Sequence, residues 1–168
     1  MKGVELDINL RLADEEDAEL ISTWLANNEV RRYLSSNLRE EIVPPQLIRV
    51  TLKRRDQAWN IVLVNGKASG LLVLDDYDST DGIANLWFCL GELSMRGAHI
   101  MPRAILLLAS SPPLSVKVLT AWAGSNNTAS LRCLERADFR LVGHIKNAFR
   151  VNGVHDRVIF EKQLGPND

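Results

Sequence analysis

Residues 90–101 read Leu90-Gly91-Glu92-Leu93-Ser94-Met95-Arg96-Gly97-Ala98-His99-Ile100-Met101. An apolar run ends at Leu90, a loop containing Arg96-Gly97 follows, and a helical pattern begins at about residue 98. The first N–H groups of a helix have no partner inside it, and the helix dipole favours negative charge there. Gly97 allows an anion to approach the backbone closely. The stretch is therefore typical of an anion site, although one glycine before a helix is more often a purely structural feature.

A second polar helix start follows the run 116–123, which is nearly all apolar and predicts a buried strand. It reads Asn127-Thr128-Ala129-Ser130-Leu131-Arg132-Cys133-Leu134-Glu135-Arg136-Ala137-Asp138-Phe139. Asn127 is a good helix cap, and Ser130 is a polar residue of the first turn. The two helix starts are expected at the ends of neighbouring strands.

The rest of the chain predicts an α/β fold built on a mixed sheet. Strands are expected at 6–13, 58–64, 67–74, 83–90, 116–123, 139–145 and 154–164. Helices are expected at 15–27, 29–34, from Pro44-Pro45 to about Arg55, 98–109 and 128–137. Asn65-Gly66 between two apolar runs predicts a hairpin, and 75–82 is polar enough for a loop. Antiparallel strands combined with strand–helix–strand crossovers predict helices on the sheet faces, whereas a Rossmann domain would alternate strand and helix throughout.

Composition narrows the function classes. The 168 residues predict one domain, 1–168. The chain has 20 Lys plus Arg against 21 Asp plus Glu, and this balance argues against a dedicated nucleic-acid binder.

The two cysteines are too few for a disulfide framework or a four-cysteine zinc site, and no cluster of residues has metal-ligand spacing. No run reaches the ~18 apolar residues of a membrane span. Glu5 and Asp7 lie where a signal peptide would be apolar, so a cytoplasmic protein with no membrane partner is expected.

Four segments carry a resemblance to a known family. They are Leu10-Arg11-Leu12-Ala13 with Asp17-Ala18 and Trp24, Arg96-Gly97, Asn127-x-x-Ser130 running to Ala137-Asp138-Phe139, and His155-Asp156-Arg157. The chain resembles the GCN5-related N-acetyltransferase (GNAT) superfamily over nearly its whole length, most closely the branch of ribosomal-protein alanine N-acetyltransferases. The segments are similar to that family's first strand and helix, its Arg/Gln-x-x-Gly-x-Gly/Ala pyrophosphate loop, its Asn-x-x-Ser helix ending in Gly-Phe, and its last strand.

The resemblance implies a GNAT fold, with a twisted, mostly antiparallel sheet of about seven strands that splays between the fourth and fifth. It implies an N-acyltransferase that moves an acetyl or other acyl group from acyl-CoA to a primary amine by direct attack. The pantetheine is expected beside the fourth strand and Asn127, and Ser130 matches the position that hydrogen-bonds the leaving thiolate. The residues implied to hold CoA are Trp87, Cys89, Leu90, Arg96, Gly97, Ala98, His99, Ile100, Met101 and Asn127.

The chain departs from the family pattern in the pyrophosphate loop. His99 and Met101 replace the later glycines, or the loop is shorter by two residues, and Asp138 replaces the glycine before Phe139. The replacements either block the diphosphate or make His99 a phosphate donor. The alternatives are a catalytically degraded ligand-binding or interaction module on this fold, and an acyltransferase that takes its acyl group from an acyl-carrier protein.

The general base is the open part of the mechanism. Alkylamines are mostly protonated at pH 7, so a base must remove a proton. Asn85 corresponds to a glutamate that related enzymes use, and Glu92 is the first candidate here, before Asp75, Asp76 and Tyr77.

The acceptor is also open. Members of the branch act on protein N-termini, polyamines, amino sugars and antibiotics. The basic residues of 49–55 hint at an anionic acceptor, Trp87 is a candidate for the acceptor pocket, and Trp24 and Trp122 are expected in the core. The protein is expected to be a monomer or a homodimer.

Overall fold

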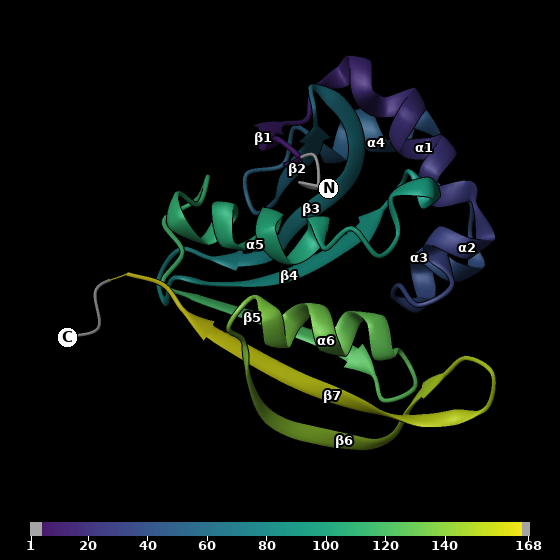
Figure 1. Ribbon diagram of the computed structural model, residues 1–168, viewed down its shortest axis with the longest axis vertical. Coiled ribbons are helices and arrows are strands. Elements are labelled where there is room, and N and C mark those ends of the chain that lie inside the picture. Colours follow the sequence, from purple (N-terminus) through teal and green to yellow (C-terminus); the bar gives the residue numbers. More distant parts are fainter. Residues whose placement is uncertain (1–4, 166–168) are drawn as a thin grey trace.

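The computed structural model describes residues 5–165 as a seven-stranded sheet in the order β1-β2-β3-β4-β5-β7-β6, with helices packed on it (Figure 1). Residues 1–4 and 166–168 of the predicted domain 1–168 lie outside the described residues. The strands are β1 (Ile8–Leu12), β2 (Ala58–Val64), β3 (Lys67–Asp78), β4 (Ile83–Leu90), β5 (Val118–Gly124), β6 (Arg140–Arg150) and β7 (Val154–Gln163). The helices are η1 (Glu15–Asp17), α1 (Ala18–Ala26), α2 (Asn28–Arg31), α3 (Ser36–Glu40), α4 (Pro45–Thr51), η2 (Leu93–Met95), α5 (Ile100–Ser110) and α6 (Thr128–Arg136).

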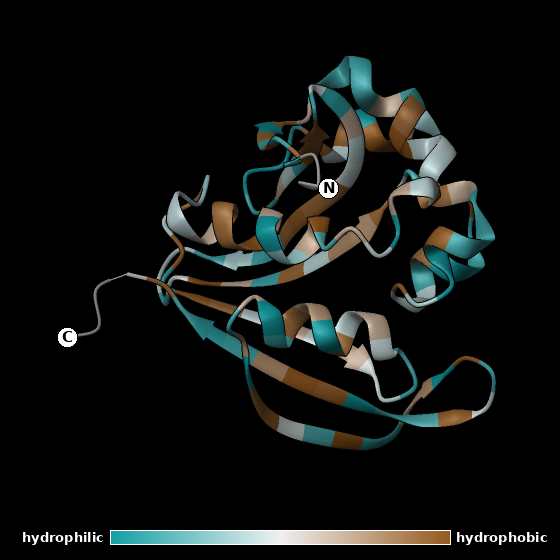
Figure 2. Cartoon of the chain, in the orientation of Figure 1, coloured by the Kyte–Doolittle hydropathy of each residue, from teal (hydrophilic) through white to brown (hydrophobic). Residues whose placement is uncertain are grey.

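Each face of the sheet carries its own hydrophobic layer. In β3, Leu72 and Leu74 pack in the layer that contains residues of α5 and α6, whereas Leu71 and Val73 pack with α1, α2 and α4. This alternation follows from the two-residue period of a strand. Figure 2 shows α6 alternating between hydrophilic and hydrophobic residues, as expected for a helix with one face on a sheet. The apolar runs of the central strands are therefore buried on both sides.

β4 and β5 are paired over only part of their length. The parallel register joins Ile83–Asn85 to Val118–Thr120, and within the described residues the stretch 86–90 of β4 has no partner on β5. That stretch stays paired with β3 on its other edge, and β5 stays paired with β7 to Gly124. The sheet therefore splays between its fourth and fifth strands. This confirms the predicted fold class, a mixed, mostly antiparallel sheet with helices on both faces.

Two strands are longer than predicted. Residues 75–78, predicted as loop, extend β3, because a register shift between Asp75 and Asp78 with φ of +49° at Asp76 absorbs the polar residues as a bulge. β6 runs to Arg150 rather than 145. It lies at the edge of the sheet and is mostly exposed, so its end carries no hydrophobic alternation by which to predict it.

Helix boundaries also differ from the predicted ones. α5 begins at Ile100 rather than 98, because His99 adopts a left-handed conformation that a helix cannot contain. Segment 36–40, for which no element was predicted, forms the short helix α3. The helix expected to reach Arg55 ends at Thr51. The predicted position of Pro102 in the first turn of α5 is confirmed.

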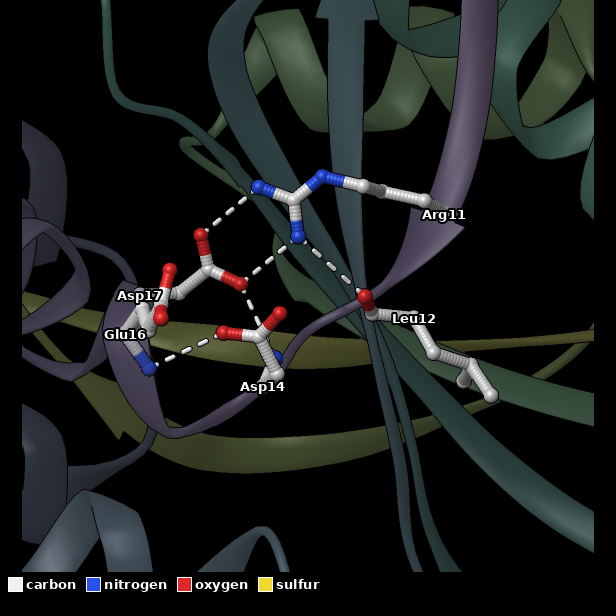
Figure 3. A network of polar contacts seen from close by, with 5 residues as sticks. All are labelled: Arg11, Leu12, Asp14, Glu16 and Asp17. Carbon is white, nitrogen blue, oxygen red and sulfur yellow. Dashed lines mark hydrogen bonds and ion pairs between the residues drawn. The ribbon is translucent and has the colours of Figure 1, made fainter.

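A charged network fixes the turn between β1 and α1 (Figure 3). The Arg11 guanidinium donates to both carboxylate oxygens of Asp17 at 2.7 Å, and Asp17 also accepts the N–H of Asp14 at 2.9 Å. Asp14 in turn accepts the N–H of Glu16, as predicted for the residue that caps this helix. The hydrogen bond from Arg11 lowers the pKa of the nearly buried Asp17 carboxyl.

Asp17→Asn is expected to lower the free energy of unfolding by about 1.5–3 kcal/mol, the worth of a hydrogen bond to a charged group. The pKa of Asp17 is lower in the folded than in the unfolded chain. The stabilisation is therefore present above the ordinary carboxyl pKa and is lost as pH falls through the folded value. Urea unfolding at neutral and acidic pH measures the difference, which is expected to shrink in acid. The exposed neighbour provides the control Glu16→Gln, and equal stability of the Asp17 variant and wild type at pH 7 would contradict the assignment.

Candidate active site

A cavity of about 520 Å³ lies where β4 and β5 separate. Its walls come from the unpaired stretch of β4, the start of α5 with the loop before it, one face of α6, and the segment 30–38. β3 contributes Asp75 and β5 contributes Trp122. The splay that ends the β4–β5 pairing thus places residues far apart in the sequence around one space.

The loop before α5 keeps a glycine-like shape although glycines are missing. His99 is the N-cap of α5 with φ of +53°, in the left-handed region that glycine adopts most easily. Gly97 has φ of +81°, and nothing lies within 4 Å of the position that a Cβ would take. Met101 is buried and packs in the core. His99 therefore supplies the dihedral angle of a glycine, and Met101 supplies a core contact.

Two arginines of α6 line the cavity together with His99. Arg136 Nη1 lies 2.5 Å from His99 Nδ1, and because a guanidinium carries only donors, the imidazole accepts at that nitrogen. Arg132 lies four residues before Arg136, which places both on one helix face. Neither arginine was among the residues predicted for the site, although their i, i+4 spacing was a signal that could have indicated them. Arg96 also lines the cavity, and its guanidinium donates to the backbone oxygen of Glu29 at 3.2 Å.

Asn127 and Ser130 form a closed pair at the start of α6. The Asn127 Oδ1 accepts the backbone N–H of Ser130 at 3.2 Å, which caps the helix, and its Nδ2 donates to Ser130 Oγ at 2.8 Å. Asn127 is buried, so the pair is held in place. Because Ser130 Oγ already accepts from Asn127, its own proton is free to donate to a group in the cavity.

Asp75 is a half-buried carboxylate in the cavity wall. It lies opposite Asn85 in the β3–β4 register, and its Oδ1 accepts from Asn85 Nδ2 at 2.8 Å. Burial raises the pKa of Asp75, with a smaller opposing effect from the Asn85 hydrogen bond. Asn85, the position at which the resemblance implies a glutamate, is therefore hydrogen-bonded to a carboxylate from the neighbouring strand.

The cavity brings together most of the residues that the sequence predicted. They are Trp87, Cys89, Leu90, Arg96, Gly97, His99, Ile100, Met101, Asn127 and Ser130. Ala98 and Glu92 are not among the lining residues. Ala98 packs against the core, and the Glu92 carboxylate lies 3.5 Å from Lys67 Nζ. Of the four base candidates, only Asp75 lines the cavity.

Trp122 and Tyr33 line the cavity and both pack against the buried ring of Phe149. Trp122 was expected in the core but is only half-buried and lines the cavity, because β5 has lost its β4 partner there. Trp122 makes an edge contact with the buried Phe149 ring at 5.7 Å, and Tyr33 stacks on Phe149 at 6.4 Å. Gly124 makes this packing possible, since a Cβ there would lie 2.2 Å from the Phe149 ring. Trp24 is buried as expected.

The basic helix residues do not reach this cavity. Arg49 pairs with Glu19 at 2.9 Å, Lys53 with Glu15 at 2.7 Å, and Arg54 with Asp56 at 2.6 Å. None of residues 49–55 lines the cavity. The hint of an anionic acceptor from these residues is therefore not supported by their position, and three of them are paired with acids of η1, α1 and the loop after α4.

The two cysteines are free and buried, and burial raises the pKa of both thiols to about 12. At neutral pH they are protonated and unsuited to act as nucleophiles. Residues 5–165 contain no group of three or more His, Cys, Asp or Glu side chains arranged to hold a metal ion. In the same part of the chain, no helix combines the length and the apolar character needed to cross a bilayer.

Comparison with known proteins matches residues 7–140 to a family model described as an acetyltransferase (GNAT) domain. Curated protein sequences gave no match. Among solved structures, a spermidine N-acetyltransferase from Vibrio cholerae in complex with CoA and spermine has a TM-score of 0.80 at 15% identity, over 94% of this chain and 95% of that one.

Two further solved structures share the fold. RimL, described as a ribosomal L7/L12 alpha-N-protein acetyltransferase in complex with coenzyme A, has a TM-score of 0.78 at 18% identity, over 94% of each chain. The microcin C7 self-immunity acetyltransferase MccE, in complex with acetyl-CoA and AMP, has a TM-score of 0.74 at 18% identity, over 94% of this chain and 93% of that one. The fold predicted from the resemblance is thus confirmed.

Proposed function

Because the chain belongs to the acetyltransferase (GNAT) domain family, we propose that it transfers an acetyl or other acyl group from acyl-CoA to a primary amine in the cavity between β4 and β5. One observation carries the proposal. The free edge of β4 at 86–90 and the Asn127–Ser130 pair face the same cavity. An extended chain can add to a free strand edge as a further strand, and the pantetheine arm of acyl-CoA has this shape and carries amide groups.

We propose that the phosphates of the donor bind at the start of α5. The cavity there is lined by Gly97, His99 and Ile100 and, from α6, by Arg132 and Arg136. Unpaired helix N–H groups and guanidinium donors are the groups that proteins use for phosphate. The Arg136 contact with His99 supports this role, because it holds a guanidinium beside the loop that lacks the family's later glycines.

The proposed reaction needs a proton acceptor and a donor, and the cavity holds a candidate for each. Asp75 would accept the proton that the amine gives up as its nitrogen attacks the thioester carbonyl carbon. As the carbon–sulfur bond breaks, Ser130 would donate its hydrogen bond to the developing thiolate. Asp75 replaces Glu92 as the first candidate for the base, since Glu92 does not line the cavity.

The acceptor and the setting are also part of the proposal. The proteins of similar fold include one bound to spermine and one described as acting on a ribosomal protein, so this chain is proposed to act on an amine of that broad range. We propose that the reaction takes place in the cytoplasm and that the enzyme is a monomer or a homodimer. We further propose that it acts without a nucleic-acid or membrane partner. The two free cysteines are consistent with a reducing compartment.

Isothermal titration calorimetry with acetyl-CoA tests the donor site. Saturable binding is expected, and Arg136→Gln is expected to weaken it about tenfold by removing a charge-assisted contact to phosphate. The matched control is Arg49→Gln, an arginine outside the cavity that is expected to leave the affinity unchanged. If the folded protein binds none of acetyl-CoA, longer acyl-CoAs and CoA, the proposed function is wrong.

A further inference from the structure

A second cavity, of about 540 Å³, lies between α3 and the β6–β7 hairpin and is called the arginine cavity below. It is lined by Ser36, Arg39, Glu40, Asn147, Ala148, Arg150, Val151 and Arg157. Three of these side chains are guanidinium groups and only one is a carboxylate. Neither α5 nor α6, which line the proposed phosphate site of the donor, contributes to it.

Two of the three arginines lie over aromatic rings. The Arg157 guanidinium carbon lies 3.8 Å from the centre of the Trp122 ring, and that of Arg39 lies 4.9 Å from the centre of Phe149. Arg39 also donates to the backbone oxygen of Arg150 at 3.3 Å. Between residues 5 and 165, none of these three arginines forms an ion pair, whereas Arg11, Arg49 and Arg54 each have a carboxylate partner.

Arg157 carries a donor that the fold leaves unused. Its Nε is buried and has no hydrogen-bond partner among the described residues. A buried donor without a partner costs free energy, and guanidinium groups bind carboxylate and phosphate through paired N–H donors. The arginine cavity therefore has the charge and the donors of an anion site.

The arginine cavity adjoins the active-site cavity. Trp122 lines the active-site cavity, and its ring also contacts the Arg157 guanidinium. Tyr33 lines the active-site cavity and stacks on Phe149, the ring over which Arg39 lies. Ser35 and Ser36, which are consecutive, belong to the two different cavities. The two cavities are therefore neighbours in the fold.

We propose that the arginine cavity binds an anionic group, phosphate or carboxylate, on the amine acceptor. This inference rests on the proposed function and specifies its substrate class. The acceptor would carry an amine at one end, for Asp75, and a negative charge at the other, for Arg39, Arg150 and Arg157. The anionic character that the sequence suggested from residues 49–55 is thus assigned to different residues.

Matched acceptor pairs test the proposal in the presence of saturating CoA or acetyl-CoA. The first pair is 2-aminoethyl phosphate and ethanolamine, and the second is a peptide beginning Ser-Asp-Asp-Asp and one beginning Ser-Asn-Asn-Asn. Binding is measured by calorimetry with CoA bound, and transfer by release of CoA from acetyl-CoA. The anionic member of at least one pair is expected to bind more tightly and to have the lower KM. The pair that responds distinguishes a small acceptor from a polypeptide.

Arginine variants locate the effect. Arg39→Gln and Arg157→Gln are each expected to lower the affinity for the anionic probe about tenfold, which corresponds to the loss of one hydrogen bond to a charged group. The affinity for the neutral probe is expected to stay unchanged. Arg157→Lys keeps the charge and is expected to recover part of the loss. The control Arg49→Gln is expected to have no effect. CoA affinity, measured on each variant, shows whether it has folded.

Two results would overturn the proposal. The first is that the CoA complex binds the anionic and the neutral member of each pair with equal affinity. Failure to bind either member counts as this result. The other is a preference for the anionic member that survives both glutamine substitutions. These outcomes are separate from failure of the proposed function, which would appear as absent binding of every CoA compound.

Discussion

Asp75→Asn is expected to lower kcat by about 10²–10⁴-fold, the usual contribution of a positioned general base. The raised pKa of Asp75 brings it closer to neutrality, which suits a base at physiological pH better than an ordinary carboxyl group does. In the wild type, kcat/KM is expected to rise with pH as Asp75 loses its proton, at a pH above the ordinary aspartate pKa. In the variant that step is expected to disappear. Steady-state kinetics over a range of pH provide the measurement.

The same substitution is expected to stabilise the protein at neutral pH. The pKa of Asp75 is higher in the folded than in the unfolded chain, so the folded state binds more protons between the two values. Stability therefore falls as pH rises through that window. Asparagine removes the buried charge, and the melting temperature of the variant at pH 7 is expected to be at or above that of wild type. Loss of activity with retained stability is characteristic of a functional residue.

The neighbouring strand residue provides the control for Asp75. Asp76 is exposed, has φ of +49° and does not line the cavity, and asparagine tolerates this conformation well. Asp76→Asn is therefore expected to leave kcat unchanged. Glu92→Gln tests the first candidate from the sequence. If Glu92→Gln abolished turnover while Asp75→Asn left it intact, the assignment of the base would be reversed.

Ser130→Ala is expected to lower kcat by about 10²–10³-fold and to leave CoA affinity nearly unchanged, because its hydrogen bond to the leaving thiolate forms mainly in the transition state. The structure separates this role from helix capping. The cap of α6 is Asn127, which accepts the Ser130 backbone N–H, and this bond survives the substitution.

Thr128→Ala is the matched control, since Thr128 begins the same helix, is exposed and does not line the cavity. It is expected to leave kcat unchanged. Thermal unfolding and acetyl-CoA calorimetry are measured on both variants. Equal kcat for Ser130→Ala and wild type, on folded protein, would show that Ser130 only shapes the helix start and that water or another residue stabilises the thiolate.

The sequence by itself determined the order of the seven strands and the start of α6, whereas it missed α3 and placed the start of α5 two residues early. Local patterns carry this information, as in the Asn65-Gly66 hairpin, the Asp14 cap and the apolar run of β5. The resemblance to the family further predicted the separation of β4 and β5 and most of the residues that line the cavity. It could do so because its motifs lie on the β4–α5 and β5–α6 connections, which border the point where the two strands separate. Boundaries were predicted less well where residues are exposed, as in β6, or where a single dihedral ends an element, as at His99.

Only the tertiary structure decided which charged residues face the cavities. Asp75 and Glu92 are both acids close to β4: Glu92 follows the strand in the sequence, and Asp75 pairs with it from β3. The Asp75 side chain accepts from Asn85, whereas the Glu92 carboxylate lies beside Lys67. Arg49 and Arg54 look like Arg39 and Arg157 in sequence. Yet Arg49 and Arg54 have acidic partners, whereas Arg39 and Arg157 lie over the rings of Phe149 and Trp122. Neutralisation and desolvation depend on neighbours from distant segments, so no local pattern predicts which charges stay available for a ligand.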